Sequence, residues 1–238
     1  MWTTIGLIVM AVGFLGVLVC AKLKSQPLAM FSAVVMLAGL GIYAYFYMNG
    51  DDAAMEDGVV FQCAIMDQAG AYLKKSVPGK NVVMVVEPGL AKYENGKKLL
   101  DAQKKAFEKA YGGSVEIVEL EVEGLNEDDG GSYADMMKAE DLEKIVAANE
   151  SADIFVITVG LPTEGVPDFK EKTVFLTNSG MIDNRDLKGA IEDGKVTAVV
   201  SGNGKKLDPD FRPDDDNLKE AFNYRWIIVD NSNLDKLK

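Results

Sequence analysis

Two long apolar runs occupy the first fifty residues of the chain. Residues 2–20 read WTTIGLIVMAVGFLGVLVC and residues 28–48 read LAMFSAVVMLAGLGIYAYFYM, and neither run contains a charged side chain. As helices, at about 1.5 Å per residue, each run would be roughly 28 to 32 Å long, which is close to the thickness of a bilayer's hydrocarbon core. A backbone in that environment satisfies its hydrogen bonds as helix. The pattern therefore predicts a transmembrane helical hairpin.

The charges that flank these runs predict an orientation. Lys22 and Lys24 lie between the runs, and an acidic linker at residues 51–57 follows the second. By the positive-inside rule the lysine turn is cytoplasmic, and both termini and the rest of the chain are extracytoplasmic. A cleaved signal peptide is disfavoured because no basic side chain precedes the first run. We therefore expect an integral protein of the inner or plasma membrane, with the lipid bilayer as the partner of residues 2–48.

Residues 58–238 show a different pattern, in which short apolar segments alternate with amphipathic ones. Residues 81–86 and 153–159 are almost continuously apolar, as expected of strands buried on both faces. Residues 115–122, VEIVELEV, alternate, which favours a strand with one wet face near the edge of a sheet. Further strands are predicted at residues 173–176, 196–200 and 224–229. Helices are predicted at residues 59–76, 95–111, 139–149 and 185–192. This alternation predicts an α/β domain with a doubly wound, mostly parallel sheet of Rossmann or flavodoxin-like type.

The order of these elements resembles known proteins. Pro78-Gly79-Lys80 precedes the first apolar strand, and residues 152–160, ADIFVITVG, form a later one. Over residues 58–203 this order resembles one lobe of the type I periplasmic sugar-binding proteins, and equally a flavodoxin-like domain. The resemblance implies a fold, and no ligand residue is transferred from it.

Composition excludes several kinds of chemistry. The 238 residues carry a formal net charge of -12, so nucleic acid is an unfavourable partner. The chain contains no histidine, which excludes Ser-His-Asp and Cys-His nucleophiles and histidine zinc sites. No glycine-rich nucleotide motif opens a helix after a strand, and we expect no cofactor. The acidic stretch at residues 208–217 does not match a calcium-binding loop, and Asp216 or Asn217 is expected to cap a helix at residues 218–222. We therefore predict no metal site.

Candidate ligand residues follow from the predicted sheet. Ligands of doubly wound sheets bind outside the carboxyl ends of the strands, close to the point where the strand order reverses. The residues predicted to bind a ligand there are Glu87, Gly89, Thr177, Asn178, Ser179, Ser201 and Asn203. Glycine and asparagine at strand ends also serve simply to turn the chain, and that alternative stays open.

Three functions fit these observations. The first is a membrane-anchored, non-enzymatic domain that binds a protein or a small ligand at the strand ends. The second is an enzyme that uses carboxylates and backbone amides at the same loops, in which Glu87, Asn178 and Asn203 act together. The third is a structural subunit of a membrane complex, with a membrane-protein partner or self-association through the helices.

Overall fold

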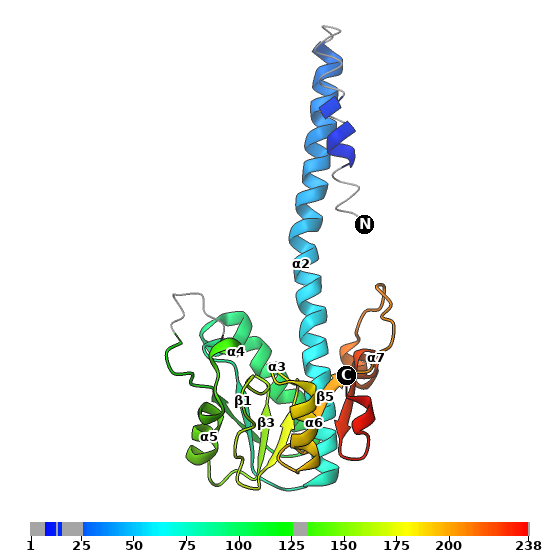
Figure 1. The fold of residues 1–238 in the computed structure, drawn as a ribbon. Coiled ribbons are helices and arrows are strands. Elements are labelled where there is room, and N and C mark those ends of the chain that lie inside the picture. The colour runs from blue at the N-terminus through cyan, green and yellow to red at the C-terminus, as the bar shows by residue number, and fades with distance from the viewer. Residues whose placement is uncertain (1–7, 13, 16–25, 126–132, 238) are drawn as a thin grey trace. The chain divides into compact units, whose positions relative to one another are not determined.

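The computed structural model describes residues 8–12, 14–15, 26–125 and 133–237 of the chain (Figure 1). The chain divides into two compact units, residues 1–58 and residues 59–238. Each unit is described by itself, and the candidate site lies in the second.

The predicted transmembrane hairpin is wrong. Helix α2 (Gln26–Ser76) begins inside the predicted lysine turn and continues through the predicted linker at residues 51–57. Among the residues that the structure describes, no helix has both the length and the apolar character that a membrane crossing requires. This finding also contradicts the predicted membrane localisation and leaves the bilayer contact of residues 2–48 without support. Most of the first run and the Lys22/Lys24 turn lie outside the described residues.

The continuity of α2 has a local cause. Residues 49–58 read NGDDAAMEDG, and none of them is proline, the residue that most strongly ends a helix. The sequence pattern predicts that the helix ends at this acidic stretch, but alanine, methionine and glutamate favour helix, and aspartate, asparagine and glycine each cost at most about 1 kcal/mol, far less than proline. The predicted second span, the predicted linker and the predicted helix at residues 59–76 are therefore parts of one element.

Six strands form one sheet in the order β2-β1-β3-β4-β5-β6. The strands are β1 (Val82–Val86), β2 (Val115–Glu119), β3 (Ile154–Ile157), β4 (Thr173–Leu176), β5 (Ala198–Gly202) and β6 (Trp226–Asp230). The first five are parallel to one another, and β6 pairs with β5 in the antiparallel direction. The predicted mostly parallel sheet is confirmed, and so is the edge position of the alternating segment that forms β2.

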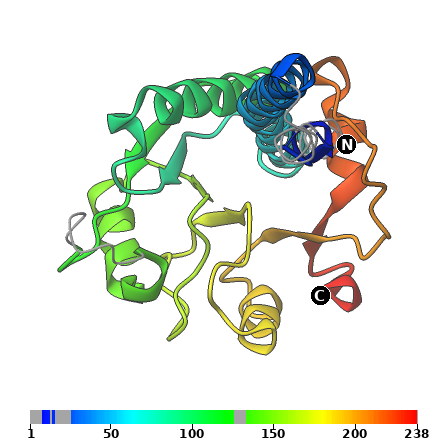
Figure 2. The same cartoon turned by 90° about the horizontal axis from the view of Figure 1, so that it is seen from above.

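Helices cover both faces of this sheet (Figure 2). Besides α2, the described part of the second unit contains the helices α3 (Glu94–Tyr111), α4 (Tyr133–Met136), α5 (Ala139–Ala148), α6 (Asn184–Glu192) and α7 (Leu218–Arg225). Short 3-10 turns are η1 (Leu90–Lys92), η3 (Asp215–Asn217) and η4 (Leu234–Lys236). One core cluster joins the C-terminal part of α2, α3 and α7 to one face through residues such as Phe107 and Phe175. The other cluster joins α5 and α6 to the opposite face through residues such as Leu142 and Phe155.

Side chains that cap helices explain where two of these elements begin. Asp183 accepts a hydrogen bond from the Arg185 N–H at 2.7 Å and starts α6. Asn217 accepts one from the Glu220 N–H at 3.3 Å and starts α7. The predicted capping role of Asn217 is therefore confirmed.

One side-chain hydrogen bond joins the C-terminal part of α2 to β6, the last strand of the sheet. The Tyr72 hydroxyl on α2 donates to Asp230 at the end of β6, at 3.0 Å. Burial, and then the hydrogen bond and charge of Asp230, raise the pKa of Tyr72 to about 12. The Ser232 hydroxyl also donates to Asp230, at 2.6 Å, and chiefly for this reason the pKa of Asp230 lies below its ordinary value.

Candidate ligand-binding site

The strand order reverses between β1 and β3, where doubly wound sheets open a crevice at their carboxyl ends. Glu87 follows β1 directly and is exposed. Tyr133 lies at the start of α4, close to Glu87. The pKa of Tyr133 is raised, chiefly by burial and then by the negative charge of Glu87. Sequence reasoning missed Tyr133, because the residues before it show no pattern that assigns Tyr133 to this edge of the sheet.

Gly89 serves the turn after β1. Its φ is 74°, in the left-handed region that favours glycine, and it precedes η1. Its N–H donates to the Glu119 carboxylate at 3.2 Å, which joins the end of β1 to the end of β2. This backbone group is therefore already used within the fold.

Two glycines bring the loops after β3 and β4 into direct contact. A Cβ added at Gly160 would lie 2.2 Å from the Gly180 Cα, so the two backbones pass each other without room for a side chain. The Leu161 N–H donates to the Ser179 carbonyl at 3.1 Å, and the Met181 N–H donates to the Leu161 carbonyl at 3.0 Å. These bonds extend the parallel pairing of the two strands beyond their ends.

The predicted ligand residues on the β4 loop hold this crossing together. Asn178 donates to the Thr158 carbonyl at 2.6 Å and accepts from the Gly180 N–H at 2.8 Å. Thr177 is buried, and its hydroxyl donates to the Ile157 carbonyl at 3.4 Å. In the structure, Thr177, Asn178 and Ser179 therefore act on the neighbouring loop.

Ser201 and Asn203 lie at the end of β5. Ser201 is a buried residue of the strand itself, opposite Ile227 of β6, although it was predicted to lie in a loop. The Asn203 side chain donates to the carbonyls of Asn223 and Tyr224 at 2.8 and 3.0 Å, and accepts from the Lys205 N–H at 2.9 Å. Asn203 thus joins the end of β5 to the last turn of α7.

A hollow of about 560 Å³ lies beside Asn203. Its lining comes from the end of β5 and the loop after it, from α7, from the start of β6 and from η4: Gly202, Asn203, Lys205, Asn223, Trp226, Ile227, Asp235 and Lys236. The Lys205 ammonium group reaches the Asn223 carbonyl at 3.3 Å. Of this lining, the sequence prediction named Asn203 and not the other polar groups, which come from separate segments of the chain.

The structure does not bring together the three residues of the predicted enzyme site. Glu87 follows β1, Asn178 follows β4 and Asn203 follows β5. Neighbouring strands lie about 4.8 Å apart, so β4 is roughly 10 Å and β5 roughly 14 Å from β1. Asn178 and Asn203 are also hydrogen-bonded to backbone groups.

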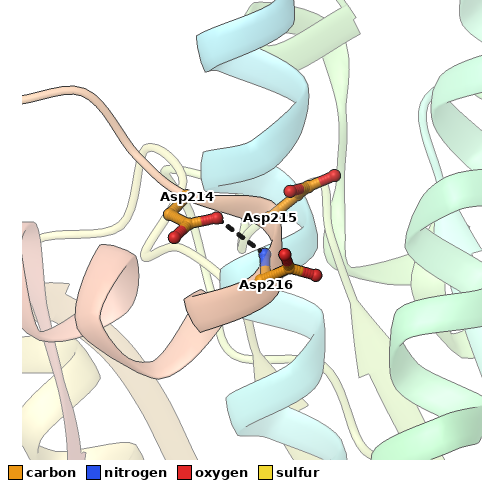
Figure 3. A group of neighbouring side chains, drawn as sticks. All are labelled: Asp214, Asp215 and Asp216. Atoms are coloured by element: carbon orange, nitrogen blue, oxygen red, sulfur yellow. Dashed lines mark hydrogen bonds between the residues drawn. The ribbon is translucent and has the colours of Figure 1, made fainter.

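Asp214, Asp215 and Asp216 form an exposed acidic cluster before α7 (Figure 3). Their carboxylate oxygens lie within 4.8 Å of one another. The Asp214 carboxylate accepts from the Asp216 N–H at 3.0 Å and caps η3. The cluster therefore has a structural role in starting the turn that leads into α7.

No protein family matches the chain, and no curated protein matches it. Three solved structures do. The first is a substrate-binding protein of a sugar ABC transport system from Bordetella parapertussis 12822. It is 15% identical to this chain, the match covers 73% of this chain and 57% of that protein, and the TM-score is 0.42. The second is a carbohydrate transporter from Acidothermus cellulolyticus 11B in complex with myo-inositol, with 13% identity, 73% and 58% covered, and a TM-score of 0.40.

The third is an ABC transporter solute-binding protein from Bradyrhizobium sp. BTAi1 with bound Bis-Tris, with 15% identity, 74% and 53% covered, and a TM-score of 0.39. The chain spans a little over half the length of each of these proteins. They match the resemblance predicted from the order of elements, and the ligands named with them belong to those proteins.

Proposed function

We propose that residues 59–238 form a non-catalytic binding domain that holds a small polar ligand in the hollow beside Asn203. The observation that supports this proposal is the composition of the hollow, which is lined by polar and charged side chains together with Trp226 and Ile227. Sites for small molecules commonly enclose about 300 to 1,000 Å³ and combine apolar surface with a few polar groups. The volume of about 560 Å³ falls within that range.

The charges of the lining favour a particular ligand chemistry. Lys205 and Lys236 are two ammonium groups in a chain whose net charge is -12, and they favour an anionic group on the ligand. The Asn223 amide and the Asp235 carboxylate offer partners for hydroxyl groups. A small hydroxylated anion, such as a sugar acid or a sugar phosphate, satisfies both requirements.

Binding is favoured over the alternative of an enzyme that uses Glu87, Asn178 and Asn203. A nucleophile and its general base must lie within hydrogen-bond reach of each other or of the substrate. These residues follow strands that are separated by other strands, and the two asparagines are hydrogen-bonded within the fold. The absence of histidine removes the most frequent general base from the whole chain.

Isothermal titration calorimetry on the full-length protein tests the proposal with glucuronate, glucose 6-phosphate, glucose and inorganic phosphate. We expect one of the two hydroxylated anions to bind more tightly than glucose or phosphate. The double variant Lys205→Gln/Lys236→Gln should bind it at least about tenfold more weakly, since each charge-assisted contact contributes on the order of 1.5 kcal/mol or more.

Lys105→Gln, an exposed lysine of α3, is the matched control and should bind like the wild-type protein. Absence of binding for all four compounds would refute the proposed ligand class. Equal affinity of the double variant and the wild-type protein would refute the proposed site.

A further inference from the structure

The sheet has two edge strands, β2 and β6, and the edge of β6 is partly closed. The outward groups of an edge strand form a template for another strand unless something covers them. On β6, the Asn233 side chain donates to the Ile228 carbonyl at 3.1 Å and accepts from the Asp230 N–H at 2.8 Å. One amide of the chain thus occupies two of the backbone groups of this edge.

The outward groups of β2 are identified by its hydrogen bonds. The Leu120 N–H donates to the Val86 carbonyl of β1 at 2.9 Å, so the even-numbered residues face β1 and the odd-numbered residues face outward. The Val115 N–H confirms this direction, because it donates to the Glu108 carboxylate of α3 at 3.0 Å instead of to β1. Glu108 therefore occupies the outward N–H of Val115, the first residue of β2.

Ile117 and Glu119 are the next two outward residues of β2. Within the described part of the chain, β1 is the one strand that pairs with β2, and no hydrogen bond reaches the outward N–H and C=O groups of Ile117 and Glu119. A hollow of about 450 Å³ lies at the carboxyl end of the strand, between residues 118–125 and the loop after β1, which contributes Pro88, Gly89 and Lys92. The edge of β2 therefore offers backbone partners for an added strand.

Charge decides which occupant fits this edge. The charged side chains of residues 115–123 are all glutamates, at positions 116, 119, 121 and 123. Pairing with β2 of a second copy would bring two sets of glutamates together, and like charges on paired strands are destabilising. A strand that carries lysine or arginine would instead place opposite charges next to these glutamates.

We propose that the outer edge of β2 binds an extended lysine- or arginine-rich segment of another protein, which adds a strand to the sheet. The backbone groups of Ile117 and Glu119 supply the main-chain hydrogen bonds, and the glutamates select a basic partner. This surface belongs to the opposite edge of the sheet from the hollow beside Asn203, so each proposal stands or fails without the other.

Fluorescence anisotropy of labelled peptides with the full-length protein tests the added strand. A peptide of alternating lysine and valine should bind saturably, and the same peptide with glutamate in place of lysine should bind at least tenfold more weakly. Two further peptides are N-methylated at alternate residues, one at the odd-numbered and one at the even-numbered positions. Methylation of the N–H groups that face β2 should abolish binding, and methylation of the other set should preserve it. If both N-methylated peptides bind like the parent, the interaction is electrostatic without strand addition and the proposal is overturned.

Variants of the protein place the interaction on the edge. Glu116→Gln/Glu121→Gln should weaken binding of the lysine peptide at least tenfold. Glu150→Gln/Glu164→Gln removes the same charge from two exposed positions outside β2 and should leave binding within twofold of wild type. Equal effects of the two pairs would overturn the proposed surface. A dimer of the free protein that the lysine peptide dissociates, seen by sedimentation, would assign the edge to a second copy and would also overturn the proposal.

Discussion

Replacement of Gly160 by alanine tests the contact between the loops that follow β3 and β4. The new Cβ would lie 2.2 Å from the Cα and 2.4 Å from the N of Gly180, whereas ordinary contacts of a Cβ begin at 3.4 Å. Both atoms belong to the backbone, so no side chain can rotate away to make room. The two loops would have to separate by about 1 Å.

The expected cost has two parts. Alanine at a φ of +73° costs about 1 to 2 kcal/mol more than glycine. Separation of the loops also disrupts the bond between Leu161 and Ser179, the bond between Met181 and Leu161, and the bond from the Asn178 amide to the Thr158 carbonyl. At about 1 kcal/mol for each bond, the free energy of unfolding should fall by about 4 to 5 kcal/mol.

Gly194→Ala provides the matched control. Its φ is +75°, but a Cβ added there meets nothing within 4 Å, so only the backbone conformation is penalised. This variant should lose about 1 to 2 kcal/mol. Urea unfolding followed by circular dichroism separates the two variants, because a difference of 3 kcal/mol corresponds to about 1.5 M in midpoint at an m-value of about 2 kcal/mol/M. Equal midpoints for the two variants would refute the argument that the loops meet at Gly160.

Two further predictions each concern one side-chain hydrogen bond, that of Tyr72 and that of Asn217. Tyr72→Phe should lower the free energy of unfolding by about 1 kcal/mol at neutral pH, because the bond to Asp230 is lost. The pKa of Tyr72 is raised to about 12 from an ordinary 10.0, so its contribution is complete below about pH 10 and is lost as the pH rises towards 12. The stability difference between wild type and variant, followed by denaturant unfolding at a series of pH values, should shrink over that interval, and a constant difference would contradict the assignment. Asn217→Ala should cost about 1 kcal/mol by removing the cap of α7, whereas Asn217→Asp, which keeps an acceptor oxygen, should retain most of that stability; equal thermal stability of the two variants would contradict the capping role.

Much of the sheet could be predicted from the sequence because the burial of a strand shows in the pattern of apolar residues along it. The continuous apolar runs at residues 81–86 and 153–159 became β1 and β3, which are buried on both faces. The alternation at residues 115–122 became the edge strand β2. Asn217 could be identified as a cap because a cap acts on backbone only a few residues away.

The membrane prediction failed because an apolar run reports the character of a segment and not where its helix ends. Residues 28–48 belong to α2, whose backbone hydrogen bonds continue to Ser76. The sequence placed a boundary at the acidic residues, but acidic residues do not interrupt a helix as proline does.

By itself, the sequence determined the α/β class, the position of the buried strands and the absence of histidine chemistry, since each depends on local pattern or composition. Only the tertiary structure decided what the polar residues at the strand ends do. Asn178 and Asn203 were predicted to bind a ligand; in the fold, the Asn178 amide donates to the loop after β3 and the Asn203 amide donates to the last turn of α7. Lys236 and Asn223 reach the hollow beside Asn203 from separate elements. An amide or an ammonium group binds whatever the fold brings within about 3 Å, and that neighbour is set by packing between segments far apart in the chain.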